Sequence, residues 1–296
     1  MIALLDRIKQ PRVILADGAM GTILMQRGLK QGEPPEKMNL EKPEILEEVA
    51  REYLDAGAEI IQTNTFGASP LKLAFFGLSD KTEEINKRAV QIVKKAVGNR
   101  AYVSGSCGPS GKLLQPYGDV SENEMIDSFQ RQLKILIDEG VDIICIETMT
   151  DLREAVLAVC TAKSISQSVP VCVSMTFDST PRGFFTIMGV SIEQAVKGLT
   201  EAGADIIGTN CGNGIEKMVS IAREMRKLNS IPLIVQSNAG IPALKDGKLV
   251  YPESPEYMAK WIPELINIGV KIIGGCCGTT PAHITLFRKI VYEYYN

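Results

Sequence analysis

A ten-residue phrase recurs four times in this chain and limits the folds that it can adopt. In each copy a glycine follows a helical pattern, a short turn comes next, and a continuous apolar run ends in polar or glycine residues. The four copies are DAGAEIIQTN (55–64), DEGVDIICIE (138–147), EAGADIIGTN (201–210) and NIGVKIIGGC (267–276). Glycine at this place is a signal for the end of a helix. Apolar runs without alternation are typical of parallel strands covered on both faces, so the phrase predicts helix–turn–strand units.

The rest of the chain supplies further units of the same kind. We predict eight strands, near 12–16, 59–64, 102–106, 142–147, 169–176, 205–210, 232–237 and 271–275. The stretch 28–45 is expected to be a long loop. Eight strand–helix units with no dividing linker predict one (β/α)₈ TIM barrel domain over residues 1–296. A doubly wound open sheet is the alternative, but DGAMGT (17–22) lacks the GxGxxG spacing of a nucleotide-binding loop.

Composition excludes some classes of partner. A formal net charge of −3 gives no electrostatic reason to expect nucleic acid or an anionic membrane. Charge interrupts the apolar residues of the N-terminus, so a signal peptide is not expected there. No apolar run reaches the roughly 18 residues of a membrane helix. We therefore expect a cytoplasmic protein, in which the seven cysteines are core residues, metal ligands or nucleophiles rather than disulfides.

Four of the cysteines have ordinary surroundings in the sequence. Cys145 and Cys172 lie within apolar strands and Cys160 lies on a helix, and we interpret all three as small hydrophobic residues. Cys107 follows a strand in VSGSCGPSG and is ambiguous.

The other three cysteines are expected to meet at the mouth of the barrel. In TIM barrels the chemistry lies on loops at the C-terminal ends of the strands. Cys211 follows the sixth strand, and Cys276 and Cys277 follow the eighth, so they flank the seventh strand at one rim. Neighbouring side chains on a strand point to opposite faces, so the strand must end here if both sulfurs serve one site. Three thiolates suit zinc with an open fourth position.

Other interpretations of the cysteine pair stay open at this point. Adjacent cysteines can be incidental or redox-active, and GGCCGTT (274–280) can be an anion-binding loop. The single histidine, His283, begins the last helix and is expected to be a surface or capping residue. One histidine also excludes most Ser/His/Asp and Cys/His schemes, so an imidazole base is not expected.

Two carboxylates follow apolar strands at the same end of the barrel. Either Asp17 or Glu147 alone can be a helix cap or can orient a loop. Together, near the backbone N–H groups of Gly18 and Ala19, they fit another role. They would bind the ammonium of an amino acid while the amides take its carboxylate.

Seven short motifs are spread from the first strand to the last helix: DGAMGT (17–22), TNTFGA (63–68), GPSG (108–111), IET (146–148), NCG (210–212), NAG (238–240) and GGCCGTTPAH (274–283). Together they resemble the homocysteine S-methyltransferase family, in particular the homocysteine-binding module of cobalamin-dependent methionine synthase. GGCCGTTPAH together with an upstream NCG is specific to this family.

The resemblance implies a zinc-containing TIM barrel that moves a methyl group to the thiol of homocysteine and forms methionine. The implied zinc ligands are Cys211, Cys276 and Cys277, with Asn238 as a displaceable fourth ligand. The implied substrate contacts are Asp17 and Glu147 for the amino group, and Gly18 and Ala19 for the carboxylate.

The expected methyl donor is methylcobalamin, either free or on a separate corrinoid protein. The alternatives are S-methylmethionine, betaine, another thiol as acceptor, or a non-catalytic zinc-binding subunit that docks a corrinoid protein. Betaine would need an aromatic cage, which is not evident from one tryptophan, Trp261, on a helix. TIMG (186–189) lacks the family's usual hydroxyl-bearing residue before its glycine, and Gln236 replaces a common acidic residue. These two departures concern the identity of the acceptor.

Overall fold

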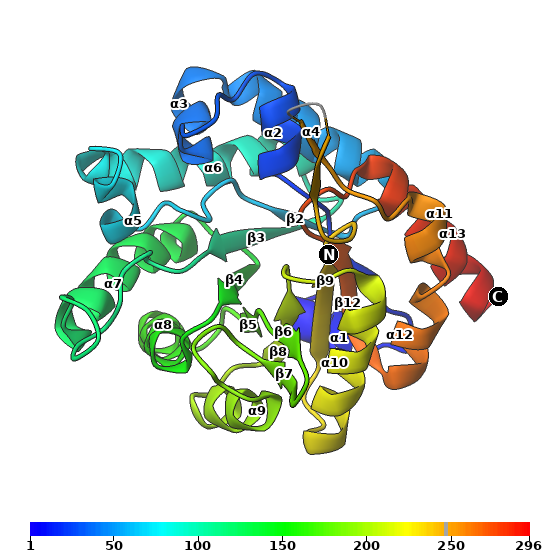
Figure 1. Ribbon diagram of the computed structural model, residues 1–296. Coiled ribbons are helices and arrows are strands. Elements are labelled where there is room, and N and C mark those ends of the chain that lie inside the picture. The colour runs from blue at the N-terminus through cyan, green and yellow to red at the C-terminus, as the bar shows by residue number, and fades with distance from the viewer. Residues whose placement is uncertain (246–247) are drawn as a thin grey trace.

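Eight parallel strands form the centre of the molecule (Figure 1). The computed structural model describes residues 1–245 and 248–296. The strands are β1 (Ile14–Leu15), β2 (Ile60–Gln62), β3 (Tyr102–Cys107), β4 (Ile143–Met149), β5 (Val171–Met175), β8 (Ile206–Asn210), β9 (Leu233–Ser237) and β12 (Val270–Gly275). Their order is β1-β12-β9-β8-β5-β4-β3-β2, and a parallel bridge between Ala16 and Ile60 joins the two ends. The predicted TIM barrel and its eight strands are confirmed.

Helices surround the strands (Figure 1). The longer ones are α4 (Pro43–Ala56), α6 (Thr82–Val97), α7 (Glu122–Asp138), α8 (Leu152–Ile165), α9 (Ile192–Glu201), α10 (Ile215–Leu228) and α13 (Pro281–Tyr295). The shorter ones are α2 (Gly21–Gln26), α5 (Pro70–Ala74), α11 (Pro255–Ala259) and α12 (Ile262–Ile268). Gly57 ends α4 at φ 108° and Gly269 ends α12 at φ 87°. These left-handed glycines are the predicted helix ends of the recurring phrase.

Three parts of the chain differ from the sequence-based expectation or were not predicted. The expected loop 28–45 is partly helical, since it holds a 3-10 turn (Pro35–Lys37), helix α3 (Met38–Glu41) and the start of α4. One antiparallel hairpin, β6 (Asp178–Thr180) with β7 (Gly183–Phe185), follows β5. A second, β10 (Ala243–Lys245) with β11 (Lys248–Val250), follows β9. Both hairpins therefore extend the loops that follow barrel strands.

Apolar side chains fill the barrel from its N-terminal end. Ile14, Ile60, Cys172, Ile234 and Ile272 belong to one buried cluster inside it. Leu4 and Ile8 of the short helix α1 (Leu4–Ile8) join this cluster and close that end. A larger cluster fills the space between the sheet and the helices. The interior is therefore apolar at the N-terminal end, and polar side chains gather at the other end.

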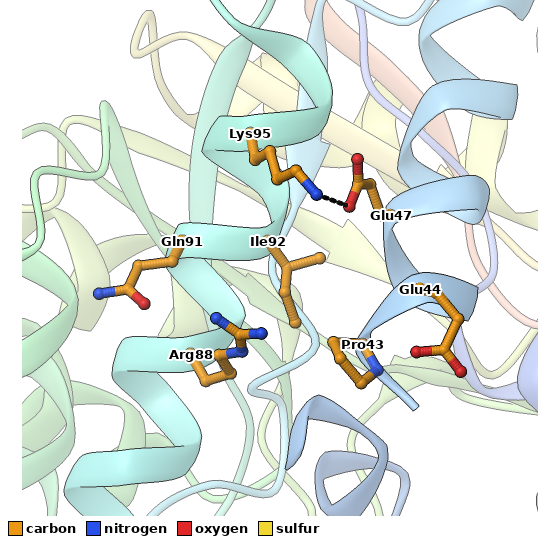
Figure 2. Close-up of a pocket in the computed structure, with 7 residues that line it drawn as sticks. All are labelled: Pro43, Glu44, Glu47, Arg88, Gln91, Ile92 and Lys95. Carbon is orange, nitrogen blue, oxygen red and sulfur yellow. Dashed lines mark hydrogen bonds and ion pairs between the residues drawn. The ribbon is translucent and has the colours of Figure 1, made fainter. Parts of the chain in front are cut away.

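The outer helices also interact through charged side chains. Figure 2 shows a shallow pocket between α4 and α6, where Lys95 Nζ lies 2.7 Å from Glu47 Oε2 beside Ile92 and Pro43. Exposed pairs of this kind contribute little to stability. The pocket is on the outside of the barrel, on the helical layer rather than at the strand ends.

The cysteines outside the predicted metal site have different surroundings. Cys145 and Cys172 are register partners on β4 and β5 and are buried, which confirms them as core residues. Cys160 is exposed on α8, so its assignment to the core is wrong. Cys107 is buried, and its Sγ donates to Gln132 Oε1 at 3.3 Å. Burial raises the pKa of Cys107 far above its ordinary value, so it stays a thiol.

None of the helices in the described ranges is both long and apolar enough to cross a bilayer.

Candidate active site

Three cysteines meet at the C-terminal ends of the strands. Cys211 follows β8, and Cys276 and Cys277 follow β12. Their three sulfur atoms all lie within 4.8 Å of one another. Cys211 is 65 positions from Cys276 along the chain, and it meets the Cys276–Cys277 pair because β8 and β12 both pair with β9.

The backbone turns sharply at both cysteine positions. Cys211 has φ 59°, a left-handed conformation that is uncommon for a residue with a side chain. At the other position, β12 ends at Gly275. Cys276 N–H then donates to Ser237 O at 2.7 Å, and Cys277 O accepts from Ala239 N–H at 2.9 Å. Because the strand ends here, the adjacent thiols are not forced to opposite faces.

The three cysteine side chains influence one another's pKa values. Hydrogen bonds from Cys276 and then Cys277 lower the pKa of Cys211 well below its ordinary value. The contact with Cys211 raises the pKa of Cys276 and of Cys277. Protonation of the three sulfurs is therefore coupled, and a cation bound among them would favour their thiolate forms.

The donor set fits a zinc ion. Tetrahedral zinc with Zn–S bonds of about 2.3 Å requires sulfur atoms about 3.8 Å apart, a spacing that the observed limit allows. The side chain of Asn238, which follows β9, lies in hydrogen-bonding contact with Cys211. Asn238 Oδ1 is buried, and the residues that the structure describes offer it no hydrogen-bond donor. A side-chain amide that contacts Cys211 and has an unpartnered oxygen suits a displaceable fourth ligand.

Two buried carboxyl groups lie at the same end of the barrel. Glu147 is the third inward-facing residue of β4, after Ile143 and Cys145. Its Oε1 accepts from Ser106 Oγ at 2.5 Å and from Gln62 Nε2 at 3.1 Å. Asp17 follows β1, and its Oδ2 accepts from Gln62 N–H at 2.8 Å. Gln62 thus contacts both carboxyl groups and fixes them relative to each other.

Both carboxyl groups have raised pKa values. Burial raises the pKa of Asp17 to about 8, against the hydrogen bond from Gln62, and repulsion from Glu147 adds to the rise. Burial likewise raises the pKa of Glu147 to about 7, although the hydrogen bond from Ser106 opposes it. Neither side chain has a cation partner among the ion pairs of the described residues. A cationic ligand would therefore stabilise their ionised forms.

The backbone at Gly18 and Ala19 is tightly packed. A Cβ atom at Gly18 would lie 2.6 Å from Thr279 Oγ1 and 2.8 Å from the Tyr53 hydroxyl, so only glycine fits. Ala19 N–H donates to Thr279 Oγ1 at 3.1 Å, and Ala19 O accepts from the Tyr53 hydroxyl at 2.9 Å. A ligand carboxylate would therefore have to share or replace the hydroxyl of Thr279 at the Ala19 amide.

A family model described as homocysteine S-methyltransferase matches residues 14–291. The chain belongs to the homocysteine S-methyltransferase family.

Relatives of this chain include long and short proteins. Methionine synthase of Mycobacterium leprae (strain TN) is 32% identical over 300 residues, which cover 95% of this chain and 24% of that protein. Methionine synthase of Mycobacterium tuberculosis (strain ATCC 25618 / H37Rv) is also 32% identical, with coverage of 95% and 25%. The chain thus spans about a quarter of the length of these two relatives.

A solved structure of the same family has nearly the same extent. The homocysteine methyltransferase MmuM from Escherichia coli, in its metallated form, superposes with a TM-score of 0.79 at 25% identity. The match covers 97% of this chain and 98% of that one. Its apo form superposes with a TM-score of 0.74.

Sequence reasoning missed several residues around the site of this family member. Ser106 and Gln62 hold Glu147, and Asn210 Nδ2 lies 3.4 Å from its Oε2. Asn210 Oδ1 also accepts from Thr148 N–H and from Ser174 Oγ, both at 2.8 Å. All these side chains face the barrel interior. Counting every second residue along each strand from the apolar inner cluster would have found Gln62, Ser106 and Asn210.

Tyr251, which follows the β10–β11 hairpin, was also missed. It forms a side-chain hydrogen bond with Cys277, and burial is the main reason that the pKa of Tyr251 rises to about 12. Its ring covers the backbone of Gly278, where an added Cβ would collide with it. No local pattern in the sequence connects this tyrosine with a cysteine 26 positions away.

His283 has a structural role. Its Nδ1 lies 3.1 Å from Thr280 N and completes a capping box at the start of α13. Its Nε2 lies 3.3 Å from Glu253 O, and the side chain is buried. The expected capping role is confirmed, although His283 is not on the surface.

Proposed function

We propose that this protein transfers a methyl group to the thiol of homocysteine and forms methionine, with zinc held by Cys211, Cys276 and Cys277. The observation that carries the proposal is the meeting of three sulfurs within 4.8 Å at the same barrel mouth as Asp17 and Glu147. A thiol and an α-amino acid group are the two parts of homocysteine, and each has a matching set of protein groups here.

The cysteines set the charge of the site. Zinc bound here would supply a Lewis acid that favours the thiolate form of the substrate. Three cysteine thiolates offset the charge of a divalent cation, so a substrate sulfur beside them stays electron-rich enough to attack a methyl carbon. Asn238 would occupy the fourth position without substrate and give it up to the substrate sulfur. His283 caps a helix, so the proposal assigns it no role as a base.

The carboxyl groups would hold the other end of the substrate. Asp17 and Glu147 would accept hydrogen bonds from the ammonium group and ionise as it binds, since each gains the cation that it lacks. Gly18 and Ala19 would donate to the substrate carboxylate, with Thr279 moving from the Ala19 amide. Fixing both ends limits the positions that the thiol can take, which favours an in-line approach to the methyl donor.

The donor is proposed to be methylcobalamin, free or on a separate corrinoid protein, because the motifs resemble the homocysteine-binding module of cobalamin-dependent methionine synthase and two relatives at 32% identity are methionine synthases. S-methylmethionine and betaine are the alternatives, since a homocysteine methyltransferase of nearly the same extent shares the fold. We further propose that residues 1–296 form one homocysteine-binding domain and that the protein is cytoplasmic.

The test is a turnover assay with purified, zinc-loaded protein. Homocysteine is offered with methylcobalamin, S-methylmethionine or betaine in turn, methionine is measured, and zinc content is determined on the same samples. Cys276→Ala should lose both zinc and turnover. Cys160→Ser, at an exposed position on α8, is the matched control and should keep both.

Three results would contradict parts of the proposal. Full turnover in a zinc-free Cys276→Ala protein would refute the metal-based mechanism. Zinc binding with no turnover for any donor would favour a non-catalytic subunit. Methylation of other thiols at rates equal to that of homocysteine would remove homocysteine as the specific acceptor.

A further inference from the structure

Gln236 has a buried amide oxygen without a partner. The residue is 2% exposed, and no donor within residues 1–245 and 248–296 reaches its Oε1. A buried carbonyl oxygen without a hydrogen bond is unfavourable. The oxygen is therefore expected to accept a hydrogen bond from something that is not part of the chain.

The strand directs Gln236 into the barrel. On β9, Leu233 and Val235 belong to the outer cluster, whereas Ile234 belongs to the inner one. Side chains alternate along a strand, so Gln236 points inward like Ile234. Its neighbours in register are Asn210 on β8 and Gly274 on β12.

Gln236 lies on β9, which the strand order places between β1, which Asp17 follows, and β4, which carries Glu147. Asn210 Nδ2 contacts Glu147 on one side. On the other side Gly274 has no side chain, and a Cβ there would lie 2.9 Å from Asp17 O and 3.3 Å from Gln236 Cγ. Gln236 O also accepts from Cys211 N–H at 3.2 Å, so the residue adjoins the sulfur cluster as well.

The number of free acceptors matches an ammonium group. Asp17 Oδ1 is buried and, within the described part of the chain, has no donor. Glu147 Oε2 has one long contact, 3.4 Å from Asn210 Nδ2. With Gln236 Oε1 they are three oxygens that lack a full complement of donors, and an ammonium has three N–H donors. The amide supplies its oxygen without adding a third negative charge.

We propose that Gln236 is a specificity-determining residue that accepts the third hydrogen bond of the substrate ammonium. The inference rests on the proposed function, because it assumes an amino acid thiol as substrate. Gln236 then selects thiols that carry an α-ammonium over those that do not.

The test compares homocysteine with 4-mercaptobutyrate, which has the same chain and thiol but no amino group. Dissociation constants for both are measured by calorimetry on zinc-loaded wild type, Gln236→Met and Gln236→Glu, with metal content and KM and kcat for homocysteine. Methionine has a similar length and no acceptor of comparable strength, whereas glutamate keeps an oxygen and adds charge. Gln91→Met, on the outer face of α6 (Figure 2), is the matched control.

Gln236→Met should weaken homocysteine binding about 10- to 100-fold, as loss of a hydrogen bond to a charged group does, and leave 4-mercaptobutyrate within about 3-fold. KM should rise with little change in kcat. Gln236→Met should thus lower the preference for homocysteine, which is the dissociation constant of 4-mercaptobutyrate divided by that of homocysteine. Gln236→Glu should raise this ratio, because its charge attracts the ammonium and repels the amino-free anion. Gln91→Met should change neither of the two dissociation constants.

Equal effects on both ligands in Gln236→Met, or an unchanged ratio in Gln236→Glu, would overturn the inference. Such a result would mean that water or packing satisfies the amide. Failure of wild type to bind homocysteine would instead refute the proposed function itself. Each variant reports a ratio within one protein, so a general loss of stability in either does not hide the result.

Discussion

Replacing Asp17 with asparagine should change the pH dependence of stability by an amount that the structure defines. The carboxyl group is buried and its pKa is raised from 3.8 to about 8. Asparagine has the same shape, and its oxygen can still accept from Gln62 N–H, which lies 2.8 Å from Asp17 Oδ2. The substitution therefore removes a titration with little change in packing.

The raised pKa of Asp17 makes wild type less stable as the pH rises. A carboxyl group with a raised pKa in the folded state holds its proton more tightly there than in the unfolded chain. Its contribution is complete below the unfolded pKa of 3.8 and is lost as the pH rises toward about 8. Each pH unit between these values lowers the free energy of unfolding of wild type by about 1.4 kcal/mol, and this loss is absent in the asparagine variant.

From pH ~5.5 to pH ~7.5 the free energy of unfolding of wild type should fall by about 2.5 kcal/mol relative to that of Asp17→Asn. This is slightly less than the full cost of two pH units, because Asp17 begins to ionise in the folded protein near the upper limit. The assay is urea denaturation of both proteins in the same metal state at several pH values. Glu147 titrates in both proteins, so to first order its contribution cancels. Asp55→Asn, at a largely exposed carboxylate on α4, is the control. Its free energy of unfolding plotted against pH should run parallel to that of wild type.

A free-energy difference between wild type and Asp17→Asn that stays constant within about 0.5 kcal/mol over this range would refute the reasoning. It would mean that Asp17 is ionised in the folded protein and already has a partner. The same variant should bind homocysteine more weakly than wild type, because the site loses a charge that the ammonium requires.

Three further predictions concern the same end of the barrel. Binding of 2-aminobutyrate, which has the ammonium but no thiol, should release protons near pH ~7 because Asp17 and Glu147 ionise; calorimetric heats that do not depend on the buffer would contradict this. Gly18→Ala should destabilise the protein by about 1–3 kcal/mol in urea denaturation because its Cβ would meet Thr279 and Tyr53, whereas Gly21→Ala, with open space around its Cβ, should cost nothing. Asn210→Asp should lower the free energy of unfolding by about 2 kcal/mol or more, as measured by thermal unfolding, since an acid would replace the amide that contacts Glu147 and Thr148. Unchanged stability at pH ~7 would show that these contacts are not needed.

Much of the fold was predictable because its signals are local. Continuous apolar runs, helix-ending glycines and helical patterns each depend on a few neighbouring residues, and all eight barrel strands were found from them. The two hairpins were missed because each strand in them has three residues and is not part of the hydrophobic core. Helix α3 was missed for a similar reason, since four residues give no clear periodicity.

The order of the strands in a barrel then made it possible to predict where the site residues lie. Because β8 and β12 flank β9, the sequence could place Cys211 beside Cys276 and Cys277 once a barrel was assumed. The same argument placed Asp17 and Glu147 at the carboxyl ends of their strands. A residue that follows a strand is at a known end of the barrel whatever its side chain does.

The tertiary structure alone decided which atoms meet. The hydrogen bonds of Glu147 come from Gln62, Ser106 and Asn210 on three other strands, and Tyr251 reaches Cys277 from a hairpin. Likewise, the unpartnered oxygen of Gln236 is recognisable only after the neighbours on β8 and β12 are known. Local sequence determines where a strand begins and ends. The inward face of each strand and its register against its neighbours depend on packing of the whole barrel, and these two features determine which polar groups are satisfied and which are left for a ligand.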